Sequence, residues 1–391
     1  MEFSKYNVFV EGYPQENYLT IYNMFTHKIM CVTKNSEAWS TQLRDKMLGQ
    51  GILVDDQIMQ QEEVLRFYHK EAGNSNELIV MLILTRKCNC KCVYCYEEQQ
   101  KAQFDDMIDI SRIISSIIDL MKQMSVQNLK VIFYGGEPLL RKDIISRTSQ
   151  TFHDLLRERY SFSIVTNGTQ IEKEDFVLWK ELGLKAIKVT LDGNEKSHNS
   201  RRPYQNGTGS YHDIVENLAD IKDYTHIVLN IVLDYSVEGI QDLITDLRKK
   251  GIEPEVSLCV KEPNDYNSEE KATLVLRTAE LLASMQVYQS TKIGFDHGII
   301  CMGKNTHTFG IDGKGVVYRC NGDFNSVIGT ISSDIEKPFS QIKSKCAQCK
   351  YLPICFGGCL YKHRCEYNYF DKVVPGLVKI YTRRTVYISR I

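Results

Sequence analysis

The feature that most constrains this chain is a group of four cysteines in residues 88–95, which read Cys-Asn-Cys-Lys-Cys-Val-Tyr-Cys. The group follows a hydrophobic run over residues 78–84, so we expect it in a loop at the end of a buried strand. Three of them can converge on one inorganic centre: Cys88, Cys92 and Cys95, which are separated by three and two residues. Cys90 is not needed as a ligand in this arrangement. Zinc usually needs four ligands, whereas a 4Fe-4S cluster bound by three cysteines keeps one iron open. A zinc knuckle and unrelated buried thiols remain the alternatives at this point.

Composition and charge exclude several classes of protein. The chain has 391 residues, 43% of them hydrophobic, which is enough for about two to three domains with real cores. Its formal net charge of -1 gives no reason to expect a nucleic acid or an anionic membrane as the main partner. The first ten residues do not resemble a signal peptide, and no apolar run reaches about 18 residues. We therefore expect a cytoplasmic protein.

The 13 cysteines agree with that expectation, because a reducing cytoplasm favours metal or redox sites over disulfides. Four lie in residues 88–95 and seven in residues 301–365. Cys31 and Cys259 stand alone in hydrophobic runs, and we expect both to be packed as small buried apolar residues.

Residues 1–75 are expected to form a small winged-helix-like unit. Their pattern predicts three short strands followed by two helices separated by glycines, over residues 6–10, 18–22, 28–32, 36–47 and 55–70. The polar and aromatic first strands would leave a sheet edge to which another chain could add a strand. A plain N-terminal cap on the next domain is the alternative.

Residues 76–265 alternate predicted strands and helices. Helical patterns such as residues 106–124 and 172–182 separate six apolar runs, over residues 78–84, 129–134, 162–165, 186–191, 226–233 and 255–260. Strands buried on both faces and separated by helices favour a parallel sheet, so the prediction is an α/β fold, an open or closed (β/α)6 barrel. Ligands of such sheets bind at the carboxyl ends of the strands.

Four polar turns fall at those strand ends and could contact a ligand. They are the cysteine group, Gly135-Gly136-Glu137-Pro138, residues 166–169 with Thr166 and Asn167, and residues 190–193 with Thr190 and Asp192. Glycines let backbone approach a ligand, and Glu137 could accept a hydrogen bond from an ammonium group. Arg202 offers a guanidinium for a carboxylate. Taken singly, each turn also has the residues that are common in ordinary loops without a ligand.

Residues 266–391 form a third expected region with a different composition. A polar linker over residues 261–271 leads into a helical pattern over residues 269–287, and seven cysteines follow among glycines and aromatics. Seven cysteines exceed one tetrahedral site, so two metal centres are favoured over zinc ribbons.

These motifs together resemble the radical SAM enzymes, with Tyr94 before the last cysteine of the Cys-x3-Cys-x2-Cys signature. The resemblance implies that Gly135, Gly136 and Glu137 contact the amino group of S-adenosyl-L-methionine (SAM), and that the turns with Thr166, Asn167, Thr190 and Asp192 also face SAM. His198 fits the same pattern, which implies Arg202 near the SAM carboxylate. The pattern of residues 301–365 resembles the seven-cysteine SPASM extension, so that the resemblance covers residues from about 77 to 366.

The SPASM resemblance implies two auxiliary 4Fe-4S clusters besides the SAM-binding one. Cys301, Cys320 and Cys359 would hold the first, and the second would be held by Cys346, Cys349, Cys355 and Cys365. Relatives with a fully ligated first cluster carry another cysteine shortly before the position of Cys301, but residues 291–300 contain none. We infer an open iron that a substrate thiolate could occupy.

A second departure concerns the substrate base. Sulfatase-maturing relatives carry an aspartate directly after the position of Cys320, where this chain has Asn321. An amide cannot serve as a base, so sulfatase maturation is disfavoured. Asp323 and Tyr318 are the candidate bases by location.

The resulting hypothesis is a radical SAM oxidoreductase that matures a ribosomally made precursor peptide. The N-terminal unit would bind the leader, and the 5'-deoxyadenosyl radical would abstract a hydrogen so that a cysteine thioether forms. A flavodoxin or ferredoxin would donate the electron. Carbon-carbon or carbon-oxygen cross-linking, epimerisation, a small-molecule substrate and a non-catalytic zinc scaffold are the rival hypotheses.

Overall fold

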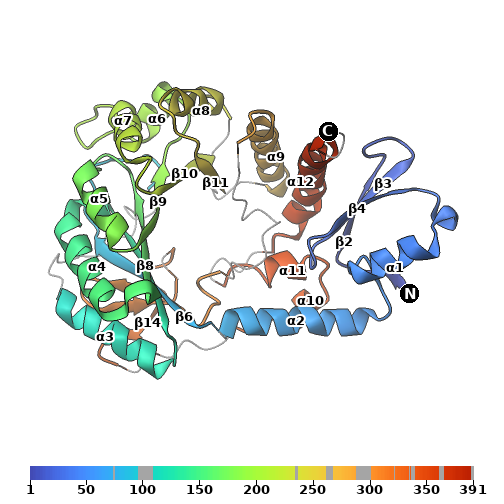
Figure 1. The fold of residues 1–391 in the computed structure, drawn as a ribbon, viewed down its shortest axis with the longest axis horizontal. Helices are drawn as coiled ribbons and strands as arrows, with labels where there is room; N and C mark the ends of the chain where they lie inside the picture. The colour runs from blue at the N-terminus through green and yellow to red at the C-terminus, as the bar shows by residue number, and fades with distance from the viewer. Residues whose placement is uncertain are drawn as a thin grey trace.

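The computed structural model describes residues 1–73, 75–95, 109–233, 237–260, 267–287, 301–320, 322–333, 335, 340–360 and 365–388, without the side chains of residues 38 and 383–388. An N-terminal unit, a parallel sheet with outer helices and a helical C-terminal segment follow one another around the molecule (Figure 1). No helix in the described part of the chain is long and apolar enough to cross a membrane.

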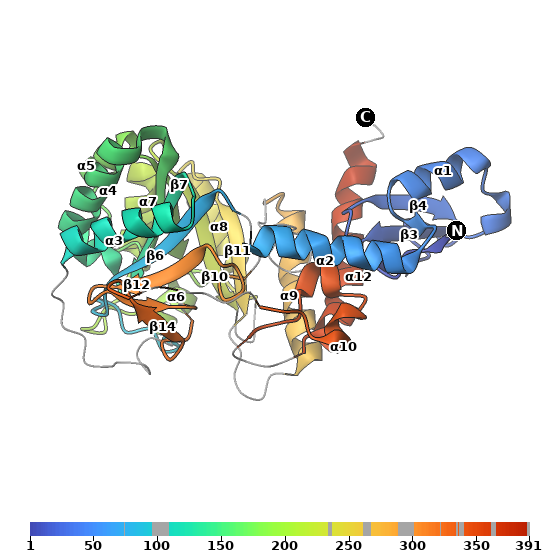
Figure 2. The ribbon, with the colours of Figure 1, turned by 90° about the horizontal axis from the view of Figure 1, so that it is seen from below.

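The N-terminal unit is built on a three-stranded antiparallel sheet of order β2-β3-β4. As predicted, three strands precede two helices, with a short β1–β5 pair beside them. The elements are β1 (Glu2–Phe3), β2 (Asn7–Glu11), β3 (Tyr18–Asn23), β4 (Ile29–Thr33), α1 (Thr41–Gly49), β5 (Leu53–Val54) and α2 (Gln57–Gly73). The long helix α2 leads from this unit to the sheet of the next one (Figure 2).

The predicted parallel sheet is confirmed, and it is open. Its six strands follow the order β11-β10-β9-β8-β7-β6, and β6 and β11 do not pair. The strands are β6 (Glu77–Thr85), β7 (Asn128–Gly135), β8 (Tyr160–Thr166), β9 (Leu184–Thr190), β10 (His226–Leu233) and β11 (Glu255–Val260). Most lie within two residues of the predicted runs, because parallel strands packed under helices are marked by unbroken apolar sequence.

Helices cover the outer face of this sheet (Figure 1): α3 (Ile110–Gln123), α4 (Lys142–Leu156), α5 (Lys173–Glu181), α6 (Glu195–Arg201), α7 (Tyr211–Ile221) and α8 (Ile240–Lys249). In α3, Asp109 caps the first turn, and a stripe at helical spacing faces the core: Ile110, Ile113, Ile114, Ile117, Leu120 and Met121. The predicted start of this helix at residue 106 lies outside the described residues.

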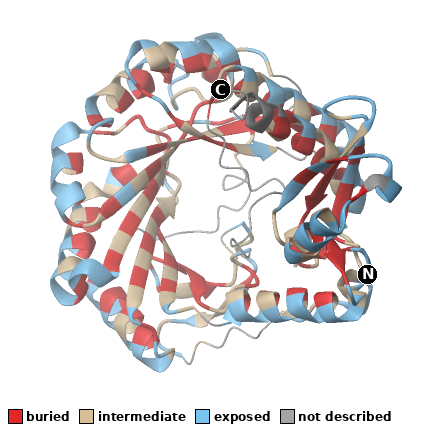
Figure 3. Cartoon of the chain, turned by 45° about the vertical axis from the view of Figure 1, so that its right-hand side comes forward, coloured by how far each residue is buried: buried red, intermediate tan, exposed pale blue. Residues whose placement is uncertain are grey.

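The sheet is less buried on its inner face than the sequence predicts. Residues of β8 alternate between buried and intermediate, with Phe162 and Ile164 fully buried under the helices. Figure 3 shows the same alternation along neighbouring strands. The expectation of strands buried on both faces is therefore wrong here, because only the outer face is covered by helices.

The C-terminal segment completes the sheet and also packs against the N-terminal unit. β12 (Thr308–Asp312) pairs in parallel with β6, and the antiparallel β13 (Val316–Tyr318) and β14 (Val327–Thr330) follow. The helices are α9 (Ser268–Ser284), α10 (Ser344–Ala347), α11 (Leu352–Cys355) and α12 (Tyr367–Ile388). Helices α9 and α12 share one core with β2 and β3, including Val8, Tyr22, Val275 and Val374.

Two cysteines expected in the interior are exposed instead. Cys31 lies on the exposed face of β4, where exposed and buried residues alternate. Cys259 is exposed on β11, the edge strand of the large sheet. Strands β4 and β11 each have a neighbouring strand on one side only, so a hydrophobic run in an edge strand does not imply that every residue in it is buried.

Candidate functional site

The cysteine loop begins directly after β6, as predicted, and rests on the segment that follows α6. The backbone N–H groups of Lys91 and Val93 donate to the carbonyl oxygens of Pro203 (2.8 Å) and Arg201 (2.9 Å). Cys90 and Cys92 are buried, whereas Cys88 and Cys95 are partly exposed. The loop therefore has a fixed backbone with two accessible thiols.

The sulfur of Cys88 already accepts hydrogen bonds. The backbone N–H of Cys90 lies 3.4 Å from Cys88 Sγ, and the side-chain amide of Asn167 lies 3.7 Å from it. The side-chain hydrogen bond with Cys90 is the main cause that lowers the pKa of the Cys88 thiol. Thiolate is the form that binds metal, so these donors fit a cluster ligand at Cys88.

The Gly-Gly-Glu-Pro turn packs against this loop more closely than any other residues would allow. A Cβ on Gly135 would lie 2.3 Å from the carbonyl oxygen of Thr85, and one on Gly136 would lie 2.4 Å from that of Lys87. The sequence suggested that these glycines let backbone approach a ligand. The structure gives a further reason, because the turn approaches the backbone that leads into the cysteine loop.

Glu137 is fully buried, and its carboxylate is used inside the protein. It accepts hydrogen bonds from the hydroxyl of Thr166 (2.6 Å) and the backbone N–H groups of Asn167 (2.7 Å) and Leu139 (2.9 Å). Burial raises the pKa of Glu137 to about 7, although these donors oppose the shift. The carboxylate thus ties two of the predicted SAM-facing turns together, and contact of the Glu137 side chain with SAM stays a prediction.

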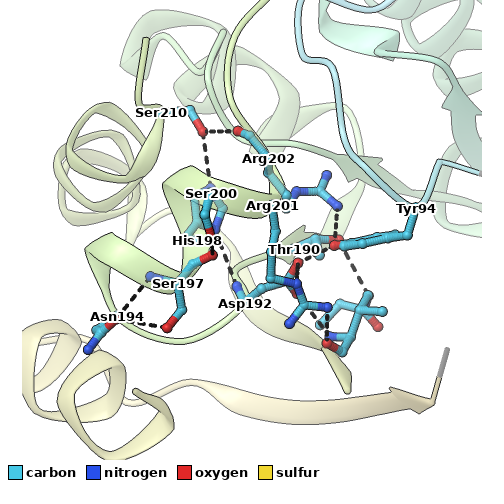
Figure 4. A network of polar contacts seen from close by, with 12 residues as sticks. Tyr94, Thr190, Asp192, Asn194, Ser197, His198, Ser200, Arg201, Arg202 and Ser210 are labelled. Atoms are coloured by element: carbon cyan, nitrogen blue, oxygen red, sulfur yellow. Dashed lines mark hydrogen bonds and ion pairs between the residues drawn. The ribbon is translucent and has the colours of Figure 1, made fainter. Parts of the chain in front are cut away.

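A second group of polar residues lies at the ends of β9 and β10 (Figure 4). The hydroxyl of Tyr94 donates to Asp192, and Arg202 Nη1 donates to the same hydroxyl at 2.9 Å. The other carboxylate oxygen of Asp192 accepts from the backbone N–H of Val232 at 3.0 Å. Tyr94, Asp192 and Arg202, predicted separately from the sequence, therefore form one network.

His198 holds this network from the side. Its Nδ1 accepts from the backbone N–H of Asp192 (3.2 Å), which leaves Nε2 to donate to Ser210 Oγ (3.0 Å). Ser210 donates onward to the carbonyl oxygen of Arg202 (2.7 Å). Burial, followed by the charges of Arg202 and Arg201, lowers the pKa of His198 to about 3. His198 is therefore a neutral residue that fixes the backbone of Arg202.

Arg202 fits the predicted anionic ligand. Among the described residues, its buried Nε has no hydrogen-bond partner. A buried guanidinium with an unused N–H next to the cysteine loop suits a carboxylate such as that of SAM. Thr190 is also buried and accepts from Asn230 at 3.4 Å.

A cavity of about 170 Å³ opens beside this network. Asp192, Arg201, Val232 and Glu238 line part of it, at the ends of β9 and β10. Arg201 is a site residue that the sequence analysis missed. It donates to the carbonyl oxygen of Val232 (2.8 Å) and lies 3.8 Å from Asp192 in an ion pair. In the sequence, its position next to Arg202 was the only feature that pointed to Arg201 as a site residue.

The C-terminal cysteines gather in two groups. The pKa of Cys320 is raised first by burial and then by nearby thiols including Cys301 and Cys359. The pKa of Cys349 is raised first by burial and then by thiols including Cys365 and Cys346, and Cys349 in turn raises that of Cys355. The two predicted ligand sets and their assignment to clusters stay predictions. In the described residues, no three His, Cys, Asp or Glu side chains converge as ligands of one metal ion.

The two candidate bases lie near Cys320 in different settings. The buried Tyr318 donates to Asp312 at 2.7 Å, and burial, then this bond, raises its pKa. Asp323 is partly exposed and accepts from the backbone N–H of Asn325 at 3.0 Å. The roles of Tyr318 and Asp323 stay predictions, and Asn321 lies outside the described residues.

Comparison with known sequences identifies the central domain. A family model described as the Radical SAM superfamily matches residues 82–247. The chain is 30% identical over 176 residues to an uncharacterized protein of Methanocaldococcus jannaschii, covering 42% of this chain and 58% of that protein. It is 23% identical over 381 residues to the radical SAM cyclopropyl synthase TigE of Paramaledivibacter caminithermalis. This match covers 83% of this chain and 77% of TigE. The first of these matches spans less than two thirds of the relative's length.

Solved structures share the fold at low sequence identity. The structure of anSMEcpe with bound AdoMet and Cp18Cys peptide aligns with a TM-score of 0.60 and 16% identity, over 78% of this chain and 97% of that chain. The structure of Streptococcus suis SuiB bound to precursor peptide SuiA aligns with a TM-score of 0.56 and 15% identity. The alignment covers 95% of this chain and 99% of the SuiB chain. Residues 82–247, which include the cysteine loop and most of the parallel sheet, are therefore identified as a radical SAM domain.

Proposed function

We propose that this enzyme matures a ribosomally made precursor peptide by forming a cross-link, with a cysteine thioether as the first candidate. Two aligned structures were solved with peptides, SuiB with its precursor peptide SuiA and anSMEcpe with Cp18Cys peptide. The SuiB alignment covers 95% of this chain. A peptide is therefore the substrate class that this chain's architecture favours.

The observation that carries the proposal is a contact between the two cysteine regions. The guanidinium of Arg86, two residues before Cys88, stacks on the ring of Phe324 at 3.4 Å from the ring centroid. Phe324 follows Cys320 by four residues and contacts Tyr318 edge-on at 5.5 Å. This contact supports a substrate held between the SAM-binding cluster and the group of Cys301, Cys320 and Cys359.

The chain's own residues would orient the reaction. Cys88, Cys92 and Cys95 would hold the SAM-binding cluster, and Arg202 would hold the carboxylate of SAM. When bound, the cluster and SAM supply the radical that removes a hydrogen atom from the substrate. Cys301, Cys320 and Cys359 would leave one auxiliary iron open for a substrate thiolate, which would keep the sulfur near the carbon that loses its hydrogen.

Carbon-carbon bond formation is the second candidate. The relative TigE, called a cyclopropyl synthase, aligns over 83% of this chain, and formation of a cyclopropyl ring needs no substrate thiol. Carbon-oxygen cross-linking and epimerisation use the same radical step and remain further alternatives.

The test is the intact mass of a short peptide encoded beside this gene, after anaerobic co-expression and thiol alkylation. A loss of two hydrogens per event together with loss of alkylation supports the thioether. The same mass loss with thiols still alkylated favours the second candidate. An unchanged mass contradicts both cross-linking proposals for that peptide.

We also propose that the β4 edge of the N-terminal sheet binds the leader of the precursor. The bonds from Lys34 N–H to Asn17 and from Asn23 N–H to Lys28, both 2.9 Å, show which residues of β4 face β3. Since hydrogen bonding alternates along an antiparallel pair, the N–H groups of Ile29, Cys31 and Thr33 point away from the sheet. These groups are available for strand addition by an extended peptide.

A matched pair of variants tests the edge more cleanly than a deletion, because removing residues 1–73 would expose the core shared with α9 and α12. Cys31→Pro removes one outward N–H, whereas Cys31→Ala keeps it. We expect leader affinity, measured by fluorescence anisotropy, to fall about tenfold for proline and to stay unchanged for alanine. Equal affinities for both variants and the wild type would contradict binding at this edge.

A further inference from the structure

Asn167 makes a contact that none of the predicted SAM-binding roles explains. It follows β8, yet its side-chain Nδ2 lies 3.7 Å from the sulfur of Cys88 and 2.8 Å from Oδ1 of Asn89, both in the cysteine loop. Asn167 is only 4% exposed. Its amide N–H groups are therefore directed at the cysteine loop and shielded from water.

The hydrogen bonds around Asn167 leave its amide one orientation. Its Oδ1 accepts from the backbone N–H and from the hydroxyl of Thr169, at 2.9 and 2.7 Å. Asn89 Nδ2 donates to the same threonine hydroxyl at 2.8 Å, which closes a ring of three hydrogen bonds. A flipped amide would turn its NH2 group towards two donors and its oxygen towards the sulfur. Nδ2 therefore faces Cys88.

The backbone of Asn167 is fixed as well. Its N–H donates to the buried carboxylate of Glu137 at 2.7 Å, and Glu137 also binds the hydroxyl of Thr166. Asn217 of α7 donates to the carbonyl oxygen of Gly168 at 3.0 Å from the other side. The donor opposite Cys88 is thus held by contacts from three separate elements.

We propose that Asn167 is a positioning residue that sets the reduction potential of the SAM-binding cluster through its N–H donor to the sulfur of Cys88. Reduction adds one electron to the cluster, and no bond to Asn167 forms or breaks. A donor aimed at a ligand sulfur stabilises the more negative, reduced state, because hydrogen bonds strengthen with the charge of the acceptor. The proposal rests on Cys88 as a cluster ligand but on no particular substrate.

Two variants remove the donor and keep the turn. In Asn167→Ser the hydroxyl can still accept from the N–H of Thr169, as in an ST turn, but it is too short to reach Cys88. In Asn167→Asp a carboxyl oxygen replaces the NH2 group without a change of size. Loss of one charge-assisted hydrogen bond corresponds to about a tenfold change in the reduction equilibrium, or about 59 mV for a one-electron couple. We expect both variants to shift the midpoint potential to more negative values by about this amount.

The measurement is a dithionite titration of the reconstituted full-length enzyme followed by electron paramagnetic resonance. The SAM-binding cluster is the one whose signal changes when SAM is added. Asn217→Ala is the matched control, because it removes a contact with the carbonyl oxygen of Gly168 while the ring of hydrogen bonds with Thr169 and Asn89 still orients the Asn167 amide, so its potential should equal that of the wild type. An unchanged potential in Asn167→Ser or Asn167→Asp overturns the proposal, and so does an equal shift in Asn217→Ala. Cys88→Ala with a full SAM-responsive cluster would instead refute the ligand assignment.

Discussion

The two cysteine regions of this enzyme are built in different ways. The loop of residues 88–95 lies at the carboxyl edge of a parallel sheet, where Asn167 and the chain at the end of α6 hold it by hydrogen bonds. The cysteines of residues 301–365 lie on turns, on a short hairpin and on the four-residue helices α10 and α11. The cysteine loop is therefore held at the edge of a sheet, whereas the C-terminal cysteines lie on short segments that pack against α2, α9 and α12.

A buried lysine marks the C-terminal region. Lys304 is 3% exposed, and its ammonium group donates to the carbonyl oxygen of Phe356. Burial lowers its pKa, while nearby thiols from both cysteine groups, including Cys355 and Cys301, oppose the shift. A buried cation is costly unless negative charge surrounds it. Protein contacts hold the loop of residues 88–95, and we expect the C-terminal cysteines to depend more on the clusters that they are proposed to bind.

The largest expected effect distinguishes the three proposed ligand cysteines from Cys90 within the loop of residues 88–95. Replacing Cys88, Cys92 or Cys95 by alanine should abolish reductive SAM cleavage, because these three thiolates are the proposed ligands of the cluster. Cys90→Ala should keep most of the activity and the cluster. The assay is 5'-deoxyadenosine release under anaerobic reduction, with iron content as the control. Equal loss in Cys90→Ala would break the ligand assignment.

Removal of iron tests whether the C-terminal region depends on bound clusters. If the C-terminal region depends on its clusters, the apoprotein should exchange amide hydrogens in residues 340–360 about tenfold faster than the holoprotein. Residues of β6 and β7 should change little, because they belong to the main hydrophobic core. Hydrogen exchange read by mass spectrometry measures both regions in one sample. Equal protection of residues 340–360 with and without iron would show that this region is as pre-organised as the barrel.

The smallest effect concerns pH and His198. Because folding lowers the pKa of His198 from 6.5 to about 3, the unfolded chain binds a proton that the folded chain excludes between these values. Stability from this residue is therefore full above about pH 6.5 and decreases as the pH falls towards 3. Urea unfolding at pH 7.5 and 5.5 should show a smaller pH dependence for His198→Gln than for the wild type. An unchanged pH dependence would mean that His198 is protonated in the folded protein.

Much of the fold could be predicted because local patterns encode it. Apolar runs marked all six strands of the parallel sheet, and a stripe at helical spacing marked α3. The exposed Cys31 and Cys259 were missed, since edge position depends on which strands pair. The site was predicted as a set of turns, but the contacts between the turns were not. Glu137 and Asn167 both belong to predicted SAM-facing turns, yet their side chains bind protein groups.

The sequence alone predicted the radical SAM domain, because the spacing of Cys88, Cys92 and Cys95 is a local feature of the chain. The roles of the seven later cysteines stay a prediction. Only the tertiary structure decided how β12 extends the sheet beside β6, how Arg86 meets Phe324 and how Asn167 reaches Cys88. Asn167 and Cys88 are 79 residues apart. Their contact arises because β6 and β8, which lie on either side of β7, end at the same edge of the parallel sheet, and sequence spacing carries no record of that geometry.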